Sequence, residues 1–474
     1  MTQKTLDSLD FTVKTLDGKC TIPSPLNLKN ADGDDEYDYV KDGERILYDA
    51  STKSLEDFKK KGKMPISFEK AGPKEKIYFQ PDKTKVAIVT AGGLCPGLNN
   101  VIKGLVTQLN QRYKVHNVVG IRYGFRGFTP GFDLVPLTSE IVDRIHLQGG
   151  SFLGSSRGEQ PSDMIVDVLQ RQNINILFCI GGDGTLRAAK SIAEEIKKRG
   201  LNIAVGCVPK TIDNDISFID KSFGFETAFS VASEIVINAH NEAKGAYNGI
   251  AMIKLMGRDS GYIAANTALA TGEANFVLIP EMKFDLYGPN GFITKLRERL
   301  EKRHHALIIV AEGAGQFLFE GDNVERDESG NVKYQDIGVF LKAKISEHFA
   351  KDKPTYLHHS IKYIDPSYII RSSPANSNDS KFCNLLSLNA IHAAMAGKTE
   401  FVVGHWNGNF TILPISATVV ERKRINLESE LWGNVLEITG QPIKMIANPD
   451  ESAQLDYIPP QSKPAAKGKK KEID

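Results

Sequence analysis

Two short polar segments of this chain carry residue types that bind phosphate groups and a divalent cation. The first is Gly181-Gly182-Asp183-Gly184-Thr185, and the second, at 209–215, reads Pro-Lys-Thr-Ile-Asp-Asn-Asp. Glycines allow backbone N–H groups to approach phosphate without an intervening Cβ. Carboxylate oxygens are the ligands that Mg²⁺ prefers. The chemistry that these segments indicate is the transfer of a phosphoryl group.

Each of these segments follows a short apolar run that predicts a buried strand. The runs span 174–180 and 203–208, and the stretch at 187–198 between them has the apolar spacing of a helix. In an open parallel α/β sheet, ligands bind outside the carboxyl ends of the strands. The two polar segments are therefore expected to meet at one edge of a sheet. From residue 86 onward short strands alternate with helices, which is the pattern of βαβ units.

The composition is that of an ordinary globular protein. The 474 residues are 41% hydrophobic and 25% charged, which suffices for two domains with appendages. The formal net charge of +1 argues against a nucleic-acid partner, because such binders normally carry a basic excess.

The sequence also bears on location. No apolar run reaches the ~18–20 residues that span a bilayer, and the acidic N-terminus lacks the apolar region of a secretory signal. The five cysteines include no Cys-x-x-Cys pair, which favours a reducing compartment. We therefore expect no membrane association and a cytoplasmic location.

Further glycine-rich and charged segments follow in a fixed order along the chain. They are Gly92-Gly93-Leu94-Cys95-Pro96-Gly97, the run at 149–157, Met256-Gly257-Arg258, Ala311-Glu312-Gly313 and the run at 363–371. Together with the first two segments they resemble the motifs of the phosphofructokinases, over residues from about 84 to 371. One glycine-rich loop is weak evidence, whereas several collinear motifs are specific. Among the phosphofructokinases, the sequence most resembles members of the plant and kinetoplastid type.

The resemblance implies an α/β fold with two Rossmann-like, doubly wound domains of parallel sheet and an active site between them. It implies an N-terminal extension at 1–83, a phosphate-donor domain at 84–224 with 371–425, a sugar-phosphate domain at 225–370 with 426–460, and a disordered tail at 461–474. Since relatives are tetramers, it also implies a homotetramer.

The implied reaction is phosphorylation of fructose 6-phosphate by ATP, with Mg²⁺ as the cofactor. Asp213 holds the place of the family's catalytic base, with Thr211, Asp215 and Arg258 assisting. An aspartate in such a loop is also common as a turn or cap residue, so this role depends on the accompanying motifs.

The resemblance assigns binding residues to both substrates. Phosphate-donor contacts, with Asp183 as the metal ligand, are implied for Gly92, Arg157, Gly182, Asp183, Gly184, Thr185 and Lys210. Contacts to the sugar phosphate are implied for Thr211, Ile212, Asp213, Met256, Gly257, Arg258, Glu312, Tyr368 and Arg371.

Two positions bear on the identity of the phosphate donor, and they favour different donors. In this family Gly184 goes with ATP, because an aspartate there would crowd and repel the α-phosphate of a nucleotide. Lys210 instead resembles the pyrophosphate-dependent members. Plant and kinetoplastid relatives combine this glycine with this lysine and use ATP. ATP is therefore the expected donor, and a pyrophosphate-dependent phosphotransferase is the alternative.

Two other classes share part of this pattern. Gly-Gly-Asp-Gly-Thr also occurs in NAD and lipid kinases, but those lack the segments at 209–215 and 256–258. A regulatory subunit should have lost its base or metal position, whereas Asp183, Asp213 and Arg258 are present. One position departs from the bacterial pattern: Gly249 stands where those relatives have an arginine that acts across the subunit interface. That contact is expected to be absent or replaced.

Overall fold

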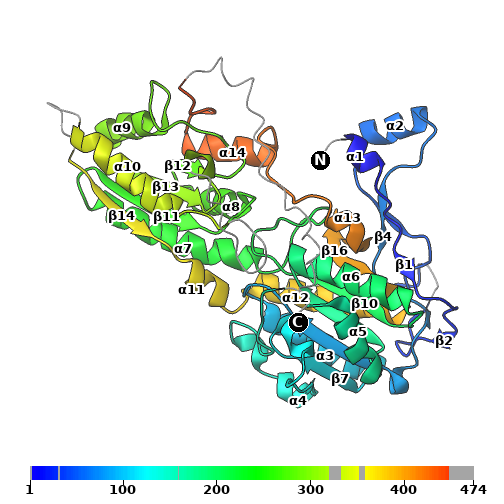
Figure 1. The fold of residues 1–474 in the computed structure, drawn as a ribbon. Helices are drawn as coiled ribbons and strands as arrows, with labels where there is room; N and C mark the ends of the chain where they lie inside the picture. Colours follow the sequence, from blue (N-terminus) through cyan, green and yellow to red (C-terminus); the bar gives the residue numbers. More distant parts are fainter. Residues whose placement is uncertain (1–2, 30–32, 159, 320–332, 352–357, 448–474) are drawn as a thin grey trace, which may run out of the picture.

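The computed structural model describes residues 3–29, 33–158, 160–319, 333–351 and 358–447. The expected disordered tail at 461–474 and most of a polar stretch at 320–335 lie outside the described residues. Figure 1 shows two lobes, each built around one sheet, with the N-terminal segment running beside the lobe of the larger sheet.

The larger sheet has nine strands, in the order β3-β4-β17-β16-β10-β9-β6-β7-β8. The strands from β16 to β7 in this order are parallel, and both edges are antiparallel. Their bounds are β3 (Arg45–Leu47), β4 (Ser67–Lys70), β6 (Lys85–Thr90), β7 (Asn117–Ile121), β8 (Val135–Pro136), β9 (Ile176–Gly181), β10 (Ala204–Pro209), β16 (Phe401–Trp406) and β17 (Asn409–Pro414).

The central strands of this sheet are buried on both faces. Along β9, Ile176, Phe178 and Ile180 belong to one apolar core, and Leu177 and Cys179 belong to the other. Successive side chains of a strand point to opposite faces, so an uninterrupted apolar run requires cover on both sides. The helices of the first face are α3 (Leu98–Gln108) and α12 (Ser377–Met395); those of the second are α5 (Ser162–Arg171) and α6 (Asp183–Lys198).

The smaller sheet has four parallel strands in the order β12-β13-β11-β14. Helices α7, α8, α9, α10 and α14 belong to this lobe (Figure 1). The bounds are α7 (Phe225–Lys244), β11 (Gly249–Leu255), α8 (Tyr262–Thr271), β12 (Phe276–Leu278), α9 (Phe292–Arg303), β13 (His305–Ala311), α10 (Ile337–Lys351), β14 (Ser360–Ile364) and α14 (Glu430–Thr439).

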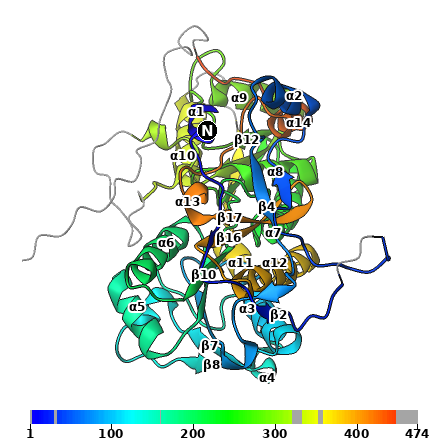
Figure 2. The same cartoon turned by 90° about the vertical axis from the view of Figure 1, so that its right-hand side faces the viewer.

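The N-terminal segment contributes to the larger sheet, which the sequence pattern did not predict. Strand β4 pairs with β17, and β3 pairs with β4 (Figure 2). The rings of Phe11 and Phe68 pack on Phe218, and Tyr48 stacks on Trp406. The remaining short elements are α1 (Gln3–Asp7), β1 (Lys14–Thr15), β2 (Ile22–Pro23), α2 (Thr52–Lys60), β5 (Lys76–Ile77), α4 (Ser139–Val142), α11 (Ser367–Ser372), β15 (Lys398–Thr399) and α13 (Ile415–Thr418).

The expected α/β fold with parallel sheets is confirmed. The strands expected at 174–180 and 203–208 are β9 and β10, and the helix expected at 187–198 is α6, which begins earlier, at Asp183. Within the residues that the structure describes, no helix is long and apolar enough to cross a membrane.

Candidate active site

The loops that follow β9 and β10 lie side by side. Pro209 is the register partner of Gly181, and the backbone N–H of Lys210 donates to the Gly181 carbonyl at 3.0 Å. The parallel ladder therefore ends where both polar loops begin, as the strand pattern predicted.

Helix α6 begins at the metal-ligand candidate. Gly182 is its N-cap and Asp183 its first residue. Thr185 is buried and packs so closely on Gly181 that a Cβ there would lie 2.1 Å from its Oγ1. Gly184 is exposed, and a Cβ on it would meet nothing within 4 Å. The free N–H groups and dipole of a helix start favour phosphate, so a side chain at 184 would project beside a bound anion.

The loop at Gly92 and Gly93 is held against two other loops. Ser155 donates its hydroxyl to the Gly92 carbonyl at 2.6 Å, and the Gly92 N–H donates to the Ser156 carbonyl at 3.1 Å. Lys210 donates its Nζ to the Gly93 carbonyl at 2.6 Å. A Cβ on Gly92 would come within 3.1 Å of that Nζ, so glycine leaves this approach open.

Three cations gather beside these loops. Burial, together with the charges of Arg371 and Arg157, lowers the pKa of Lys210. Lys210, Arg157 and Arg371 repel one another, so an anionic ligand beside them would be stabilised. This is the setting that a phosphate donor or a sugar phosphate requires.

Asp213 is half-buried, and its Oδ1 has no hydrogen-bond partner among the described residues. Its backbone N–H donates to the Thr211 hydroxyl at 3.1 Å. Burial, with the charges of Asp215 and Glu312, raises the pKa of Asp213 to about 7, against the opposing effects of Arg371 and the Arg258 backbone N–H. A carboxylate suits the role of general base when one of its oxygens is available to accept a proton and its pKa lies near neutrality.

Asp215 contacts Thr211 in the same loop and also lies near Arg422, a cation that was not predicted from the sequence. Thr211 donates its hydroxyl to Asp215 Oδ1 at 3.0 Å. Arg422 Nη1 lies 3.5 Å from Asp215 Oδ2, and its Nη2 lies 3.9 Å from Asp183 Oδ2. Arg422 also pairs with Asp259, another residue that was not predicted. The basic run at 422–424 was the signal in the sequence for this cation.

The carboxylates of Asp183 and Asp215 suit a Mg²⁺ ion that also binds phosphate oxygens and water. In the part of the chain that the structure describes, no three Asp, Glu, His or Cys side chains converge as a ready-made metal site. Asp183 and Asp215 nevertheless lie within reach of one shared cation, the guanidinium of Arg422. Mg²⁺ is usually held by one or two carboxylates together with phosphate oxygens and water, and this donor set matches that arrangement.

The loops after β11 and β13 form the opposite side of the site. The Glu312 N–H donates to the Leu255 carbonyl at 2.8 Å, and the Gly313 N–H donates to the Gly257 carbonyl at 3.0 Å. Gly257 has φ +129°, and a Cβ there would lie 2.6 Å from the Ser260 carbonyl oxygen, so this turn requires glycine. The guanidinium of Arg258 lies 4.5 Å from the centre of the Tyr334 ring.

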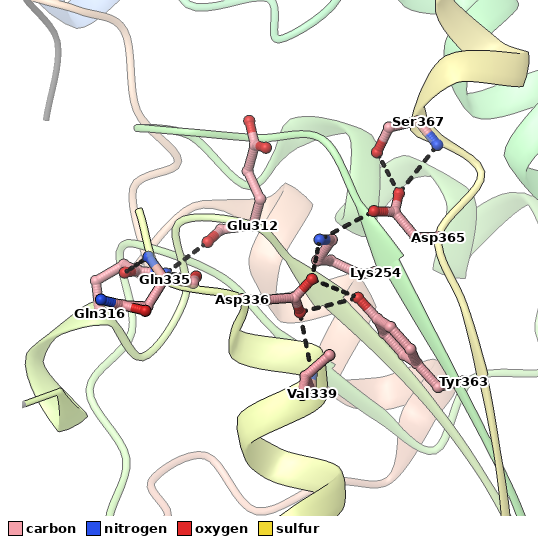
Figure 3. A network of polar contacts seen from close by, with 9 residues as sticks. All are labelled: Lys254, Glu312, Gln316, Gln335, Asp336, Val339, Tyr363, Asp365 and Ser367. Atoms are coloured by element: carbon pink, nitrogen blue, oxygen red, sulfur yellow. Dashed lines mark hydrogen bonds and ion pairs between the residues drawn. The ribbon is translucent and has the colours of Figure 1, made fainter. Parts of the chain in front are cut away.

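A network of polar contacts lies beside this loop, and the Glu312 carboxylate points away from it. Lys254 Nζ contacts Asp336 at 2.6 Å and Asp365 at 2.9 Å, and Tyr363 donates to Asp336 at 2.9 Å. Figure 3 shows the Glu312 carboxylate directed away from these groups. Lys254 therefore anchors the chain just before α11, the helix that carries Tyr368 and Arg371.

The expected sugar-phosphate residues divide into two groups. The charges of Glu312 and Arg371 and the backbone N–H of Arg258 all affect the pKa of Asp213, so these three residues lie near the candidate base. Met256 and Ile212 have side chains in the apolar core, at 0% and 7% exposure. Only their backbone can face a ligand.

Tyr368 is 84% exposed on α11, on the surface of the single chain. Gly249 is the departure noted from the bacterial pattern. A Cβ there would lie 2.1 Å from the Ala243 carbonyl oxygen, so this backbone has no room for an arginine.

Comparisons with known proteins show which family the chain resembles. The family described as phosphofructokinase matches residues 85–394. An ATP-dependent 6-phosphofructokinase of Borreliella burgdorferi is 47% identical over 450 residues, which cover 93% of this chain and 98% of the relative. The Arabidopsis thaliana protein named ATP-dependent 6-phosphofructokinase 5, chloroplastic, is 46% identical over 375 residues, which cover 79% of this chain and 69% of the relative.

Among solved structures, a pyrophosphate-dependent phosphofructokinase of Marinobacter aquaeolei has a TM-score of 0.61 with this chain. The likeness covers 81% of this chain and 100% of the other, at 19% identity, and so concerns the fold alone. The extent of the family match and the identity to the bacterial and plant relatives establish the family. The chain belongs to the phosphofructokinase family.

Proposed function

We propose that this chain is an ATP-dependent 6-phosphofructokinase, which transfers the γ-phosphoryl group of ATP to the 1-hydroxyl of fructose 6-phosphate. The observation that carries the proposal is Asp213. Its buried Oδ1 has no hydrogen-bond partner among the described residues, and Asp215, Glu312 and Arg371 lie near enough to affect its pKa. The names of the curated relatives support the same activity.

In the proposed reaction Asp213 accepts the proton of the 1-hydroxyl. The O1 oxygen forms a bond to the γ-phosphorus as the bond from that phosphorus to the β,γ-bridging oxygen breaks. Fructose 1,6-bisphosphate and ADP leave, and Asp213 returns its proton to solvent. Transfer of this kind depends mainly on positioning and on charge neutralisation.

The donor side supplies that neutralisation. The N–H groups at the start of α6 and the cations Lys210 and Arg157 face the phosphates. Asp183, assisted by Asp215, would hold Mg²⁺, which when bound neutralises charge on the β- and γ-phosphates. Thr211 donates a hydrogen bond that orients Asp215.

The acceptor side holds the sugar. Arg258 and Arg371 have the planar, forked donors that suit a phosphate group, and Glu312 is placed to accept hydrogen bonds from sugar hydroxyls. The charge of Arg371 also opposes the rise in the pKa of Asp213, which is consistent with Arg371 and the base facing the same substrate.

ATP as the donor is supported by the open space at Gly184, which leaves room for a nucleotide α-phosphate. Pyrophosphate remains the second candidate because Lys210 lies buried at the phosphate loops. The test is formation of fructose 1,6-bisphosphate by the purified chain, with Mg²⁺ and either ATP or pyrophosphate. Turnover with ATP alone is the expected result. Turnover with pyrophosphate alone would reverse the donor assignment, and none with either would contradict the proposed activity.

We also propose a homotetramer in the cytoplasm, with one domain built on each sheet and boundaries near 224, 370 and 425. Exposed Tyr368 supports assembly, because a second chain can cover it. Sedimentation velocity should give a species of about four chains, and a fully active monomer would contradict this. Cell fractionation tests the compartment, since some curated relatives are named chloroplastic.

A further inference from the structure

Arg422 belongs to the segment 421–425, which follows α13 and runs along the loop of the proposed base. Arg422 forms an isolated antiparallel bridge with Ile216, and the Lys423 N–H donates to the Asp215 carbonyl at 2.8 Å. Ser217 donates its hydroxyl to the Glu421 carbonyl at 2.8 Å. The backbone of the 421–425 segment is thus fixed to the loop that carries Asp213 and Asp215.

The same segment is also fixed to the lobe of the smaller sheet. Tyr262 donates its hydroxyl to the Arg424 carbonyl at 3.0 Å. Glu281 accepts from the N–H of Ile425 at 2.8 Å and from that of Gly261, at the start of α8, at 3.0 Å. One short segment therefore joins the donor-side loop to the turn that follows Arg258.

This placement puts the Arg422 guanidinium among carboxylates from three separate loops. Asp183 comes from the loop after β9, Asp215 from the loop after β10 and Asp259 from the loop after β11. The Arg422 side chain is 27% exposed, and those of the three aspartates are 8–19% exposed. Carboxylates this sheltered repel one another unless a cation lies between them.

We propose that Arg422 is a positioning residue that acts as an internal counter-ion. It holds Asp183, Asp215 and Asp259 in place until a divalent cation at Asp183 and Asp215 displaces it. The inference rests on the proposed function only in taking Asp183 as the metal ligand. The Arg422 guanidinium contacts Asp183 Oδ2, an oxygen of the proposed metal ligand. The same oxygen also accepts a hydrogen bond from Arg187 Nε at 3.0 Å.

This arrangement predicts that the divalent cation binds tightly only together with the phosphate donor. The divalent cation and the guanidinium compete for the same oxygens, so the free protein should bind the cation weakly. Because the backbone of Arg422 is fixed, a displaced guanidinium stays nearby and can pair with the phosphates of the donor. The donor thus gives Arg422 a new partner, and metal binding becomes coupled to donor binding.

The test measures Mn²⁺ binding to the full chain without nucleotide or sugar, by the loss of the free-Mn²⁺ paramagnetic resonance signal. Arg422→Gln should bind Mn²⁺ about tenfold more tightly than the wild type, because one competing charge has been removed from the site. Arg422→Lys, which keeps the charge, should stay near the wild type. Arg424→Gln is the matched control, since Arg424 lies on the same segment at 4.0 Å from Asp259, and it should change nothing.

A second variant keeps the inference testable if Arg422→Gln folds poorly. Asp259→Asn takes one partner from Arg422, which then pairs more with Asp183 and Asp215, so Mn²⁺ should bind more weakly than to the wild type. Equal affinity of the wild type and Arg422→Gln, or no Mn²⁺ binding by Arg422→Gln, would overturn the proposal. In the absence of a folded Arg422→Gln, unchanged or tighter binding by Asp259→Asn would overturn it.

The double variant Arg422→Gln/Asp183→Asn separates this inference from the proposed function. Loss of the tight Mn²⁺ binding in the double variant supports both. Tight binding that persists without the Asp183 carboxylate would refute Asp183 as the ligand, and with it both the metal assignment and this inference. If Asp183→Asn alone weakens binding while Arg422→Gln has no effect, only the counter-ion role fails.

Discussion

The proposed donor and acceptor sides of the site are built in different ways. The donor side lies at the end of one continuous parallel ladder, where Pro209 pairs with Gly181 and Lys210 continues the hydrogen bonding. The acceptor side combines the turn at Gly257 with α11, a six-residue helix on which Tyr368 is 84% exposed. The sheet itself fixes the donor side, whereas a charge network and an exposed helix position much of the acceptor side.

This difference has a consequence for substitutions. On the donor side an altered side chain should change the chemistry or the donor, because the backbone beneath it is held by the ladder. On the acceptor side a change distant from the sugar can move α11 and alter substrate affinity. The predictions below separate these two kinds of effect.

The largest expected effect is on the base, where the two sides meet. Asp213→Asn should lower kcat by about 10²–10⁴-fold, because the amide cannot accept the proton, and should leave the KM for fructose 6-phosphate largely unchanged. Steady-state kinetics with a direct binding measurement checks this. Asp220→Asn, at the exposed end of the same loop, is the control and should remain active. Near-normal turnover by Asp213→Asn would end its role as the base.

The next effect tests the donor side alone. Gly184→Asp should lower kcat/KM for ATP by about 100-fold through repulsion of the nucleotide phosphates, with little change in the KM for fructose 6-phosphate. The new side chain meets open space and Gly184 has no positive φ, so the fold is not strained. Gly433→Asp, at another helical glycine with open space around it, is the matched control. Unchanged ATP kinetics in Gly184→Asp would refute the crowding argument.

A smaller effect tests the acceptor side. Lys254→Met removes the ammonium group between Asp336 and Asp365 and should loosen the start of α11, raising the KM for fructose 6-phosphate about tenfold. The KM for ATP should change little. Lys362→Met, on neighbouring β14, removes an exposed pairing with Glu242 of α7 and provides the comparison. Equal effects on both substrates would mean that the two sides are not separately built.

The smallest expected effect is a pH dependence. The pKa of Asp213 is raised to about 7, first by burial, and the base must be ionised to accept a proton. Activity should therefore fall as the pH is lowered, with kcat/KM losing about tenfold per pH unit well below a midpoint near 7. The profile of Asp213→Asn should be flat in this range, and an identical profile would assign the titration to another group.

Much of the donor side was predictable because its residues are local to two apolar strands. The runs at 174–180 and 203–208 located β9 and β10, and parallel pairing then placed Asp183 near Asp213. Arg422 was not predictable in this way, because its place depends on a backbone bridge to Ile216, more than 200 residues earlier in the chain. Asp259 was missed beside Arg258 because it becomes significant only once Arg422 lies against it.

The N-terminal strands and the acceptor side show two further limits. Strands β3 and β4 are three and four residues long, too short for an apolar alternation to stand out, and they are held by pairing with distant β17. The side chains of Met256 and Ile212 lie in the core although their motifs flank the site, because a motif does not reveal which way each side chain points. For Tyr368, the sequence gives no measure of what a second chain would cover.

We propose that Asp213 is the general base in phosphoryl transfer from ATP to fructose 6-phosphate. The most direct measurement is transfer of the labelled γ-phosphoryl group of ATP in a single turnover, with the wild type and Asp213→Asn side by side at saturating substrates. We expect labelled fructose 1,6-bisphosphate from the wild type and a rate lower by orders of magnitude from the variant. Equal rates, or no transfer to fructose 6-phosphate by the wild type, would contradict it.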